Sequence, residues 1–231
     1  MRRLSLNGYI DDEVWLGDEI TPGLLHVALY GEDGQSDDDV QIVLNSYGGS
    51  CSAAVRMYDD VCAYPGKVTM IISGTAASAA TVLAMAADEL EMTPGSLYMI
   101  HDPSVVAWGN ERDLQEAINL LAACKDSILN VYARRCKLPR NDLAQMMTDT
   151  TWMDAQAALK HGFIDRISVP EKGVQNAIPK EITREEAGDK VKAYFDRHRP
   201  RREDHYHDTT PEQQRSGVSY AQLMKRLELI K

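Results

Sequence analysis

Short apolar runs alternate with helical patterns along the first 167 residues of the chain. Runs of β-branched and other apolar residues, typical of buried strands, occupy residues 40–44, 68–73 and 96–100. Apolar positions at helical spacing, or rows of small residues, predict helices at residues 53–63, 78–87, 110–136 and 154–161. Strands that are separated by helices predict an α/β fold with a mainly parallel sheet.

Capping residues support these helices. Ser50 is placed to cap the first of them, and Asn110 with Asp113 three positions later has the pattern of a capping box at the start of the long third helix. Gly162 directly follows the last helix, where a glycine commonly ends a helix. Three of the four predicted helices therefore have a sequence signal at one end as well as along their length.

The charge of the chain changes after residue 167. Residues 1–167 carry 12 Lys and Arg against 24 Asp and Glu, whereas residues 168–231 carry 13 against 11. The apolar density also falls there, and the basic run at 197–202 cannot bury itself. We therefore predict one domain at residues 1–167 and a charged, partly disordered tail at residues 168–231. The tail closes with an amphipathic helix whose apolar positions are Tyr220, Leu223, Met224, Leu227 and Ile230.

The chain as a whole is acidic, with a formal net charge of −10 and a pI near 5.1. This charge argues against nucleic acid or an anionic membrane surface as the main partner. No apolar run approaches the roughly 18 residues of a membrane span, and the first residues lack the apolar stretch of a signal peptide. The four cysteines form no CxxC pair, which predicts buried thiols in a reducing compartment. We expect a cytoplasmic protein.

Three segments at the ends of predicted strands carry candidate chemistry. The first holds Gly48 and Gly49, the second places Ser78 at a helix start among Ala and Gly, and the third ends a strand in His101. A histidine is the usual base that activates a serine, and backbone N–H groups of the glycine turn and of the residue after the serine would hold an oxyanion. Taken singly, such segments are more often a turn, a plain helix cap and a structural histidine.

Together, and in this order, the segments resemble the ClpP family of serine peptidases. The resemblance implies a ClpP/crotonase-like fold with flanking helices and a long protruding handle helix, to which the segment at residues 111–136 is similar. It also implies a homo-oligomer, expected as a ring. It spans about residues 3–167 and is carried by Ser46-Tyr47-Gly48-Gly49, Gly74-Thr75-Ala76-Ala77-Ser78 and Met99-Ile100-His101.

The resemblance assigns roles to individual residues. It makes Ser78 the nucleophile and His101 the general base that later acts as the general acid. It places the oxyanion hole at the backbone N–H groups of Gly48 and Ala79. These assignments define the predicted catalytic site, apart from its acid.

The acid of the triad departs from the family pattern. Counted back from Trp152, the family's acid position falls on Thr150, and the nearest carboxylate belongs to Asp149. We expect Asp149 to orient His101, because triad geometry tolerates different sequence positions. Asp102 directly follows His101 and is set aside, since neighbouring residues of a strand face opposite sides.

A narrower set of motifs resembles the ClpP-related head maturation proteases of tailed phages and prophages. That likeness implies an ATP-independent serine endopeptidase that cuts capsid or scaffold protein, in the bacterial host cytoplasm or inside the procapsid. Little chain precedes the first predicted strand at residues 4–10, so no dedicated unfoldase partner is expected. The motifs are Ile100-His101-Asp102-Pro103, Ala107-Trp108-Gly109-Asn110 and Thr151-Trp152-Met153-Asp154-Ala155, with Ala158, Gly162, Phe163 and Asp165.

Three other functions stay open. The displaced acid is compatible with a catalytically weak relative that acts as an assembly or interaction subunit. The general likeness is compatible with a ClpP-type cytoplasmic peptidase that has no role in phage assembly. An acyl-CoA enzyme of the related crotonase fold also uses glycine-lined oxyanion donors, although that chemistry needs no activated serine.

No cofactor and no metal ion are expected. His205 and His207 lie in the polar tail without obvious further ligands, and the acidic run at residues 37–39 is more typical of a solvated loop than of a calcium site. The sequence contains neither a Walker motif nor a GxGxxG loop.

Overall fold

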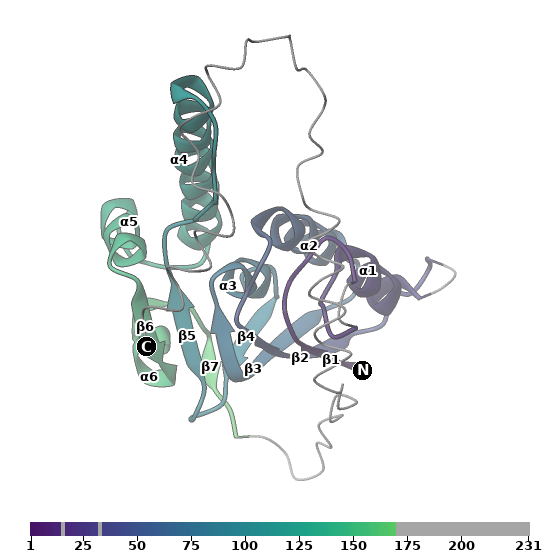
Figure 1. Cartoon of the computed structure of the whole chain (residues 1–231). Coiled ribbons are helices and arrows are strands. Elements are labelled where there is room, and N and C mark those ends of the chain that lie inside the picture. Colours follow the sequence, from purple (N-terminus) through teal and green to yellow (C-terminus); the bar gives the residue numbers. More distant parts are fainter. Residues whose placement is uncertain (15–16, 32–33, 170–231) are drawn as a thin grey trace, which may run out of the picture. The chain divides into compact units, whose positions relative to one another are not determined.

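The computed structural model describes residues 1–14, 17–31 and 34–169 of the chain. Within them, seven strands form one sheet in which every strand pairing is parallel except that of β5 with β6 (Figure 1). The predicted α/β fold with a mainly parallel sheet is thereby confirmed. The strands are β1 (Arg2–Asn7), β2 (Val40–Ser46), β3 (Val68–Ala77), β4 (Glu89–Met92), β5 (Leu97–Ile100), β6 (Thr151–Asp154) and β7 (Arg166–Ile167).

Helices flank this sheet, and α2 contacts both α1 and α3. The predicted caps are present: Ser50 accepts from the Ala53 N–H, Asn110 and Asp113 form a capping box, and Gly162 ends α6 in the left-handed conformation. The helices of the described residues are α1 (Pro22–Tyr30), α2 (Cys51–Ala63), α3 (Ala79–Ala84), α4 (Glu111–Ala133), α5 (Arg140–Thr148) and α6 (Ala155–His161).

The central strand β3 places the candidate site. One edge of β3 pairs with β2, while its other edge pairs first with β4 and then, over residues 75–77, with β5. Because β2, β3 and β5 run parallel, the segments that follow them emerge at the same edge of the sheet. These segments carry Gly48, Ser78 and His101, which are far apart in the sequence.

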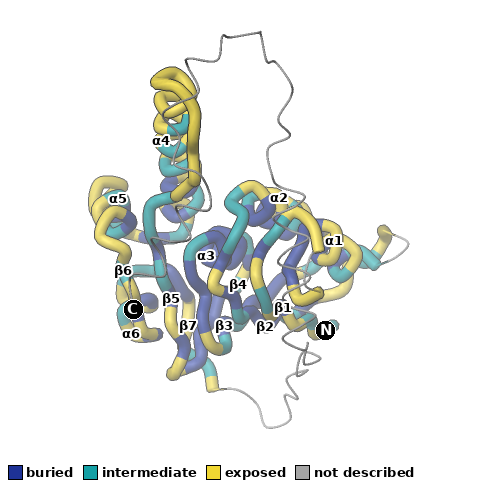
Figure 2. Tube along the Cα trace, in the orientation of Figure 1, coloured by how far each residue is buried: buried dark blue, intermediate teal, exposed yellow. Residues whose placement is uncertain are grey.

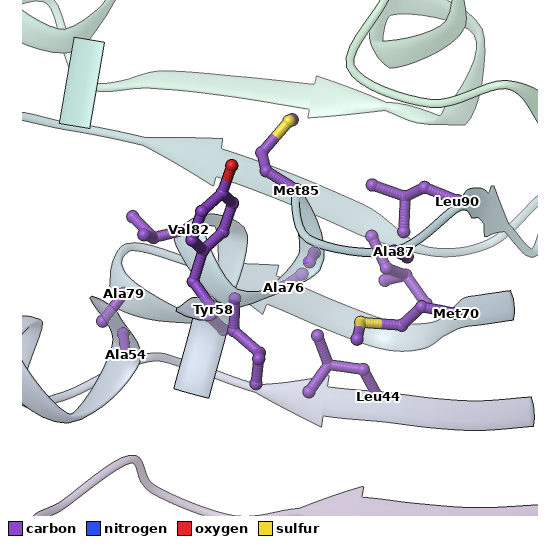
Figure 3. Close-up of a cluster of buried hydrophobic side chains, with 14 of the residues drawn as sticks. Leu44, Ala54, Tyr58, Met70, Ala76, Ala79, Val82, Met85, Ala87 and Leu90 are labelled. Carbon is purple, nitrogen blue, oxygen red and sulfur yellow. The ribbon is translucent and has the colours of Figure 1, made fainter. Parts of the chain in front are cut away.

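The core fills the space between the sheet and the helices α2 and α3 with few aromatic residues. Leu44 and Met70 from neighbouring strands pack with Tyr58 of α2 and Val82 of α3 (Figure 3). Every residue of α3 is buried, and the small side chains of Ala79, Ala80 and Ala84 let this helix approach the strands closely. Burial of each large apolar side chain contributes about 1.5–3 kcal/mol.

Helix α4 projects from the sheet, as expected of a handle helix (Figure 1). Its outer half is exposed along the Cα trace, including Leu114 and Ile118 (Figure 2). Only Ile128, Leu129 and Tyr132 near its C-terminal end are buried. The apolar positions of the outer half are therefore not covered by the described part of this chain.

Several expectations from the sequence are corrected by the structure. Strand β3 continues to Ala77, and α3 begins after Ser78 and ends at Ala84, so Ser78 is not itself helical. Of the four free cysteines, only Cys136 is buried, and burial raises the pKa of its thiol to about 12, whereas Cys62 is exposed. The predicted tail lies outside the described residues except for 168 and 169, and the division at residue 167 stays a prediction.

Among the residues that the structure describes, no helix combines the length and the apolar character needed to cross a membrane.

Candidate active site

Ser78 occupies a strained turn between β3 and α3. Its backbone has φ 57° and ψ −127°, a conformation that non-glycine residues rarely adopt and that costs about 1–3 kcal/mol. The Ser78 N–H donates to the carbonyl of Met99 in β5 at 2.9 Å, which holds the turn against the neighbouring strand. The Ser78 side chain makes no capping hydrogen bond to α3, so it is not a plain helix cap and its hydroxyl is free for other contacts.

His101 lies next to Ser78. Nε2 of His101 is 2.7 Å from Oγ of Ser78, which is hydrogen-bond distance for a base and a nucleophile. Both residues are partly exposed, so a substrate can reach them. The sequence separates them by 23 positions, and the pairing of β3 with β5 brings them together.

Gly48 lies close against the turn of Ser78. A Cβ at this position would lie 2.5 Å from the Ala77 carbonyl oxygen and 2.9 Å from the Ala79 nitrogen, and φ is 94°. Only glycine fits such a contact without displacing the backbone. The Gly48 N–H donates to Ser46 Oγ at 3.1 Å here, so a substrate oxygen bound at this N–H would replace or share that bond. The structure thus brings Gly48 and Ala79 together beside Ser78.

The structure does not bring Asp149 into contact with His101. Asp149 is exposed at the C-terminal end of α5, and its Oδ1 accepts from Gln145 Nε2 at 2.8 Å. Within the described residues, the hydrogen bond to Ser78 is the only one that the imidazole makes. Thr150, at the expected acid position, has φ 52°, which is unusual for a β-branched residue. The role of Asp149 stays a prediction.

A cavity of about 350 Å³ opens at Ser78 and His101. One part of its wall is apolar, from Val82 of α3 and Ile128 of α4, and Tyr132 and Cys51 also line it. Burial, and to a smaller extent the neighbouring Cys124, raises the pKa of the Cys51 thiol. This thiol therefore stays protonated near neutral pH and adds no charge to the cavity.

Known proteins resemble this chain over the same region. The family profile described as Clp protease matches residues 3–171. The chain belongs to the Clp protease family. It is 30% identical over 133 residues to an ATP-dependent Clp protease proteolytic subunit of Deinococcus radiodurans, covering 57% of this chain and 65% of that protein. It is 31% identical over 132 residues to ATP-dependent Clp protease proteolytic subunit 1 of Chlamydia pneumoniae, covering 55% and 69%.

The alignment thus spans a little less than two thirds of the Deinococcus relative. The α/β architecture with its mainly parallel sheet is consistent with membership of the Clp protease family. The finer likeness to head maturation proteases comes from individual motifs of the sequence, and the two relatives carry no such name.

Two supports of the Clp protease site were not predicted from the sequence. The hydroxyl of Tyr132 lies 2.6 Å from Oγ1 of Thr81, and Thr81 bonds the Ser78 carbonyl through both its N–H and its hydroxyl. Asp102 was set aside as a residue of a strand, but β5 ends at Ile100, and the Asp102 carboxylate pairs with Lys125 of α4. The helical spacing of Lys125 and Tyr132, seven positions apart, was the only sequence signal for these supports.

The described residues offer no metal site: nowhere in residues 1–14, 17–31 or 34–169 do three His, Cys, Asp or Glu side chains gather to hold an ion. His205 and His207 lie outside these ranges.

Proposed function

We propose that this member of the Clp protease family is a serine endopeptidase in which Ser78 is the nucleophile and His101 is the general base. The contact of 2.7 Å between Nε2 and Oγ carries the proposal, together with the absence of a capping bond from the Ser78 hydroxyl. A serine that only ended a strand or began a helix would not need a strained backbone and a histidine beside its hydroxyl.

The reaction proceeds through an acyl-enzyme. Ser78 Oγ attacks the carbonyl carbon of the scissile peptide bond while its proton passes to Nε2 of His101. The N–H groups of Gly48 and Ala79 stabilise the oxyanion of the tetrahedral intermediate. The C–N bond then breaks as His101 protonates the leaving amine, which leaves an ester on Ser78.

Water completes the cycle. His101 removes a proton from a water molecule that attacks the ester carbonyl, and a second tetrahedral intermediate forms in the same oxyanion hole. Its collapse releases the carboxylate product and returns the proton from His101 to Ser78. Asp149 is proposed to orient the imidazole in both steps, which requires its carboxylate to leave the contact with Gln145.

The biological role that we propose is ATP-independent processing of capsid or scaffold protein during phage head maturation. The motifs at residues 100–103, 107–110 and 151–155 support this role. The names of the two relatives favour a second candidate, a general Clp-type peptidase that works with an ATP-driven partner. Cleavage of purified procapsid shells without ATP supports the first candidate, and cleavage that needs an added unfoldase and ATP supports the second.

We also propose that the chain works as a homo-oligomeric ring. Leu114 and Ile118, one helical turn apart, leave an exposed apolar face on the outer half of α4. Leu120 is exposed on another side of the same helix, and Trp108 is exposed just before it. Large exposed apolar side chains gathered on one element are typical of a protein interface. Sedimentation velocity of the purified chain tests this proposal, and a monomer at micromolar concentration would contradict it.

The activity is tested by Ser78→Ala, with Ser127→Ala on the exposed surface of α4 as the matched control. We expect the first variant to lose both peptide cleavage and labelling by a fluorophosphonate probe while its thermal unfolding stays close to that of the wild type. The control keeps both activities. A wild-type chain that neither cleaves nor labels would instead support the assembly subunit, and turnover of an acyl-CoA thioester would support the crotonase-like alternative.

A further inference from the structure

The residue after His101 is the centre of a polar cluster that joins three elements. Lys125 Nζ of α4 lies 2.7 Å from Oδ1 and 2.9 Å from Oδ2 of Asp102. Thr148, at the end of α5, accepts from the same ammonium at 2.8 Å, and its Oγ1 lies 3.1 Å from Asp102 Oδ2. Asp102, Lys125 and Thr148 are called the Asp102 cluster below.

A backbone hydrogen bond also holds Asp102 in place. The Asp102 N–H donates at 3.1 Å to the carbonyl of Met147 in the last turn of α5, a carbonyl that also accepts from the Thr150 N–H at 3.1 Å. The side chains of Lys125 and Asp102 are 26% and 39% exposed, so their ion pair is better shielded from water than a surface pair. Residue 102 is therefore held by α4 and by α5 at once.

One face of α4 supports both partners of the candidate dyad. Lys125 and Tyr132 are two helical turns apart and lie on the same side of α4. Lys125 reaches the segment of His101 through Asp102, and Tyr132 reaches the turn of Ser78 through Thr81. Helix α4 therefore supports the segments of both His101 and Ser78, in addition to the pairing of β3 with β5.

We propose that Lys125 and Thr148 are positioning residues that act through Asp102 to hold His101 at hydrogen-bond distance from Ser78. The inference rests on the proposed function, since it concerns the geometry of that same pair. A displacement of about 1 Å at a catalytic group lowers the rate by roughly a hundredfold, so a support directly next to the base affects catalysis without touching the substrate. Lys125 also neutralises the charge of Asp102, the residue that directly follows His101.

This charge balance predicts opposite pH effects for the two partners. Without Lys125, the unpaired Asp102 favours the protonated imidazole, so the acid limb of kcat/KM moves to higher pH. Without the Asp102 charge, Lys125 favours the neutral imidazole, so the acid limb moves to lower pH. Beside the Asp102 cluster, the titratable groups around His101 are Tyr9, Tyr47, Cys51 and Tyr132 in the cavity and Asp149 at the end of α5.

The test uses Lys125→Met, Lys125→Arg and Asp102→Asn, with Lys137→Met as the matched control. Lys137 is exposed and makes no side-chain hydrogen bond or ion pair in the described part of the chain. We expect Lys125→Met to lower kcat about tenfold or more while KM changes less than threefold, and Lys125→Arg to restore most of the loss. The acid limb should move by about half a pH unit or more, upward for Lys125→Met and downward for Asp102→Asn.

A second measurement separates this inference from the proposed function. In the inactive Ser78→Ala background, NMR follows the protonation of the His101 imidazole, and its midpoint should move in the same two directions. These midpoints test the Asp102 cluster even if the wild-type chain proves inactive. Should Lys125→Met fail to fold, Asp102→Asn, which keeps the side-chain volume, carries the test alone. Equal kcat values for Lys125→Met and Lys137→Met, or midpoints that move in the same direction for both partners, would overturn the inference.

Discussion

The hydroxyl of Tyr132 lies 2.6 Å from the hydroxyl of Thr81, and this contact joins α4 to the turn of Ser78. Thr81 in turn bonds the Ser78 carbonyl through its N–H at 2.9 Å and through its Oγ1 at 2.5 Å. Burial raises the pKa of the Tyr132 hydroxyl, so this group stays neutral and acts as a hydrogen-bonding group. The strained backbone of Ser78 is thus supported by neutral hydrogen bonds.

We predict that Thr81→Val destabilises the chain more than Tyr132→Phe does. Tyr132→Phe removes one hydrogen bond, worth about 1 kcal/mol, and leaves the bonds of Thr81 to Ser78 in place. Thr81→Val removes the side-chain support of Ser78 and leaves the buried Tyr132 hydroxyl unpaired, which costs about 1–3 kcal/mol. Urea unfolding measures both. If Tyr132→Phe lowers the free energy of unfolding more than Thr81→Val does, this prediction is wrong.

The contact of Gly48 with the nucleophile turn predicts a severe effect of a single methyl group. Gly48→Ala places a Cβ 2.5 Å from the Ala77 carbonyl oxygen, so the turn must move and the proposed oxyanion donor is displaced. We expect kcat to fall about a hundredfold or more, as for the loss of an oxyanion donor. Gly23→Ala is the control, because a Cβ there meets nothing within 4 Å. If Gly48→Ala keeps the kcat of the wild type, Gly48 does not act as an oxyanion donor.

Much of the fold could be predicted because its signals are local. Runs of Val and Ile predict β2 and β3, and Asn110 with Asp113 predicts the start of α4. Five elements were not predicted, since each is short and has a weak pattern of its own: helices α1 and α5 and strands β4, β6 and β7. Their place is decided by tertiary packing, which the pattern of one chain does not show.

The sequence likewise predicts some residues of the candidate site and not others. Ser78, His101 and Gly48 could be found because each sits where a strand ends, and parallel pairing then gathers strand ends at one edge. Lys125 and Thr148 could not, because their contacts with Asp102 depend on how α4 and α5 cross the segment after β5. A local sequence pattern does not reveal contacts between residues that are far apart in the chain. A charged residue on a helix usually faces solvent, so Lys125 gives no signal of its own.

The cavity predicts selective protection of one cysteine. Because burial raises the pKa of Cys51, its thiolate is scarce at pH 8, and we expect iodoacetamide to alkylate exposed Cys62 first. Raising the pH increases the thiolate fraction and speeds the reaction of Cys51, while Cys136, with a pKa of about 12, stays unreacted. Cys51 lines the cavity with Ser78, so a bulky fluorophosphonate on Ser78 should slow its alkylation. Mass spectrometry of the peptides measures the alkylation of each cysteine. If Cys51 is alkylated equally fast with and without the fluorophosphonate on Ser78, the two residues do not share a cavity.

The predicted acid gives the sharpest test of the triad. If Asp149 orients His101 during turnover, Asp149→Asn lowers kcat about a hundredfold or more, because the imidazole loses the charge that stabilises its protonated form. Gln145→Ala frees the Asp149 carboxylate from its present partner and should leave kcat unchanged or raise it. Steady-state cleavage of a fluorogenic peptide measures both. If Asp149→Asn stays within threefold of the wild type, Ser78 and His101 act as a dyad without this carboxylate, and the exposed position of Asp149 at the end of α5 is its working position.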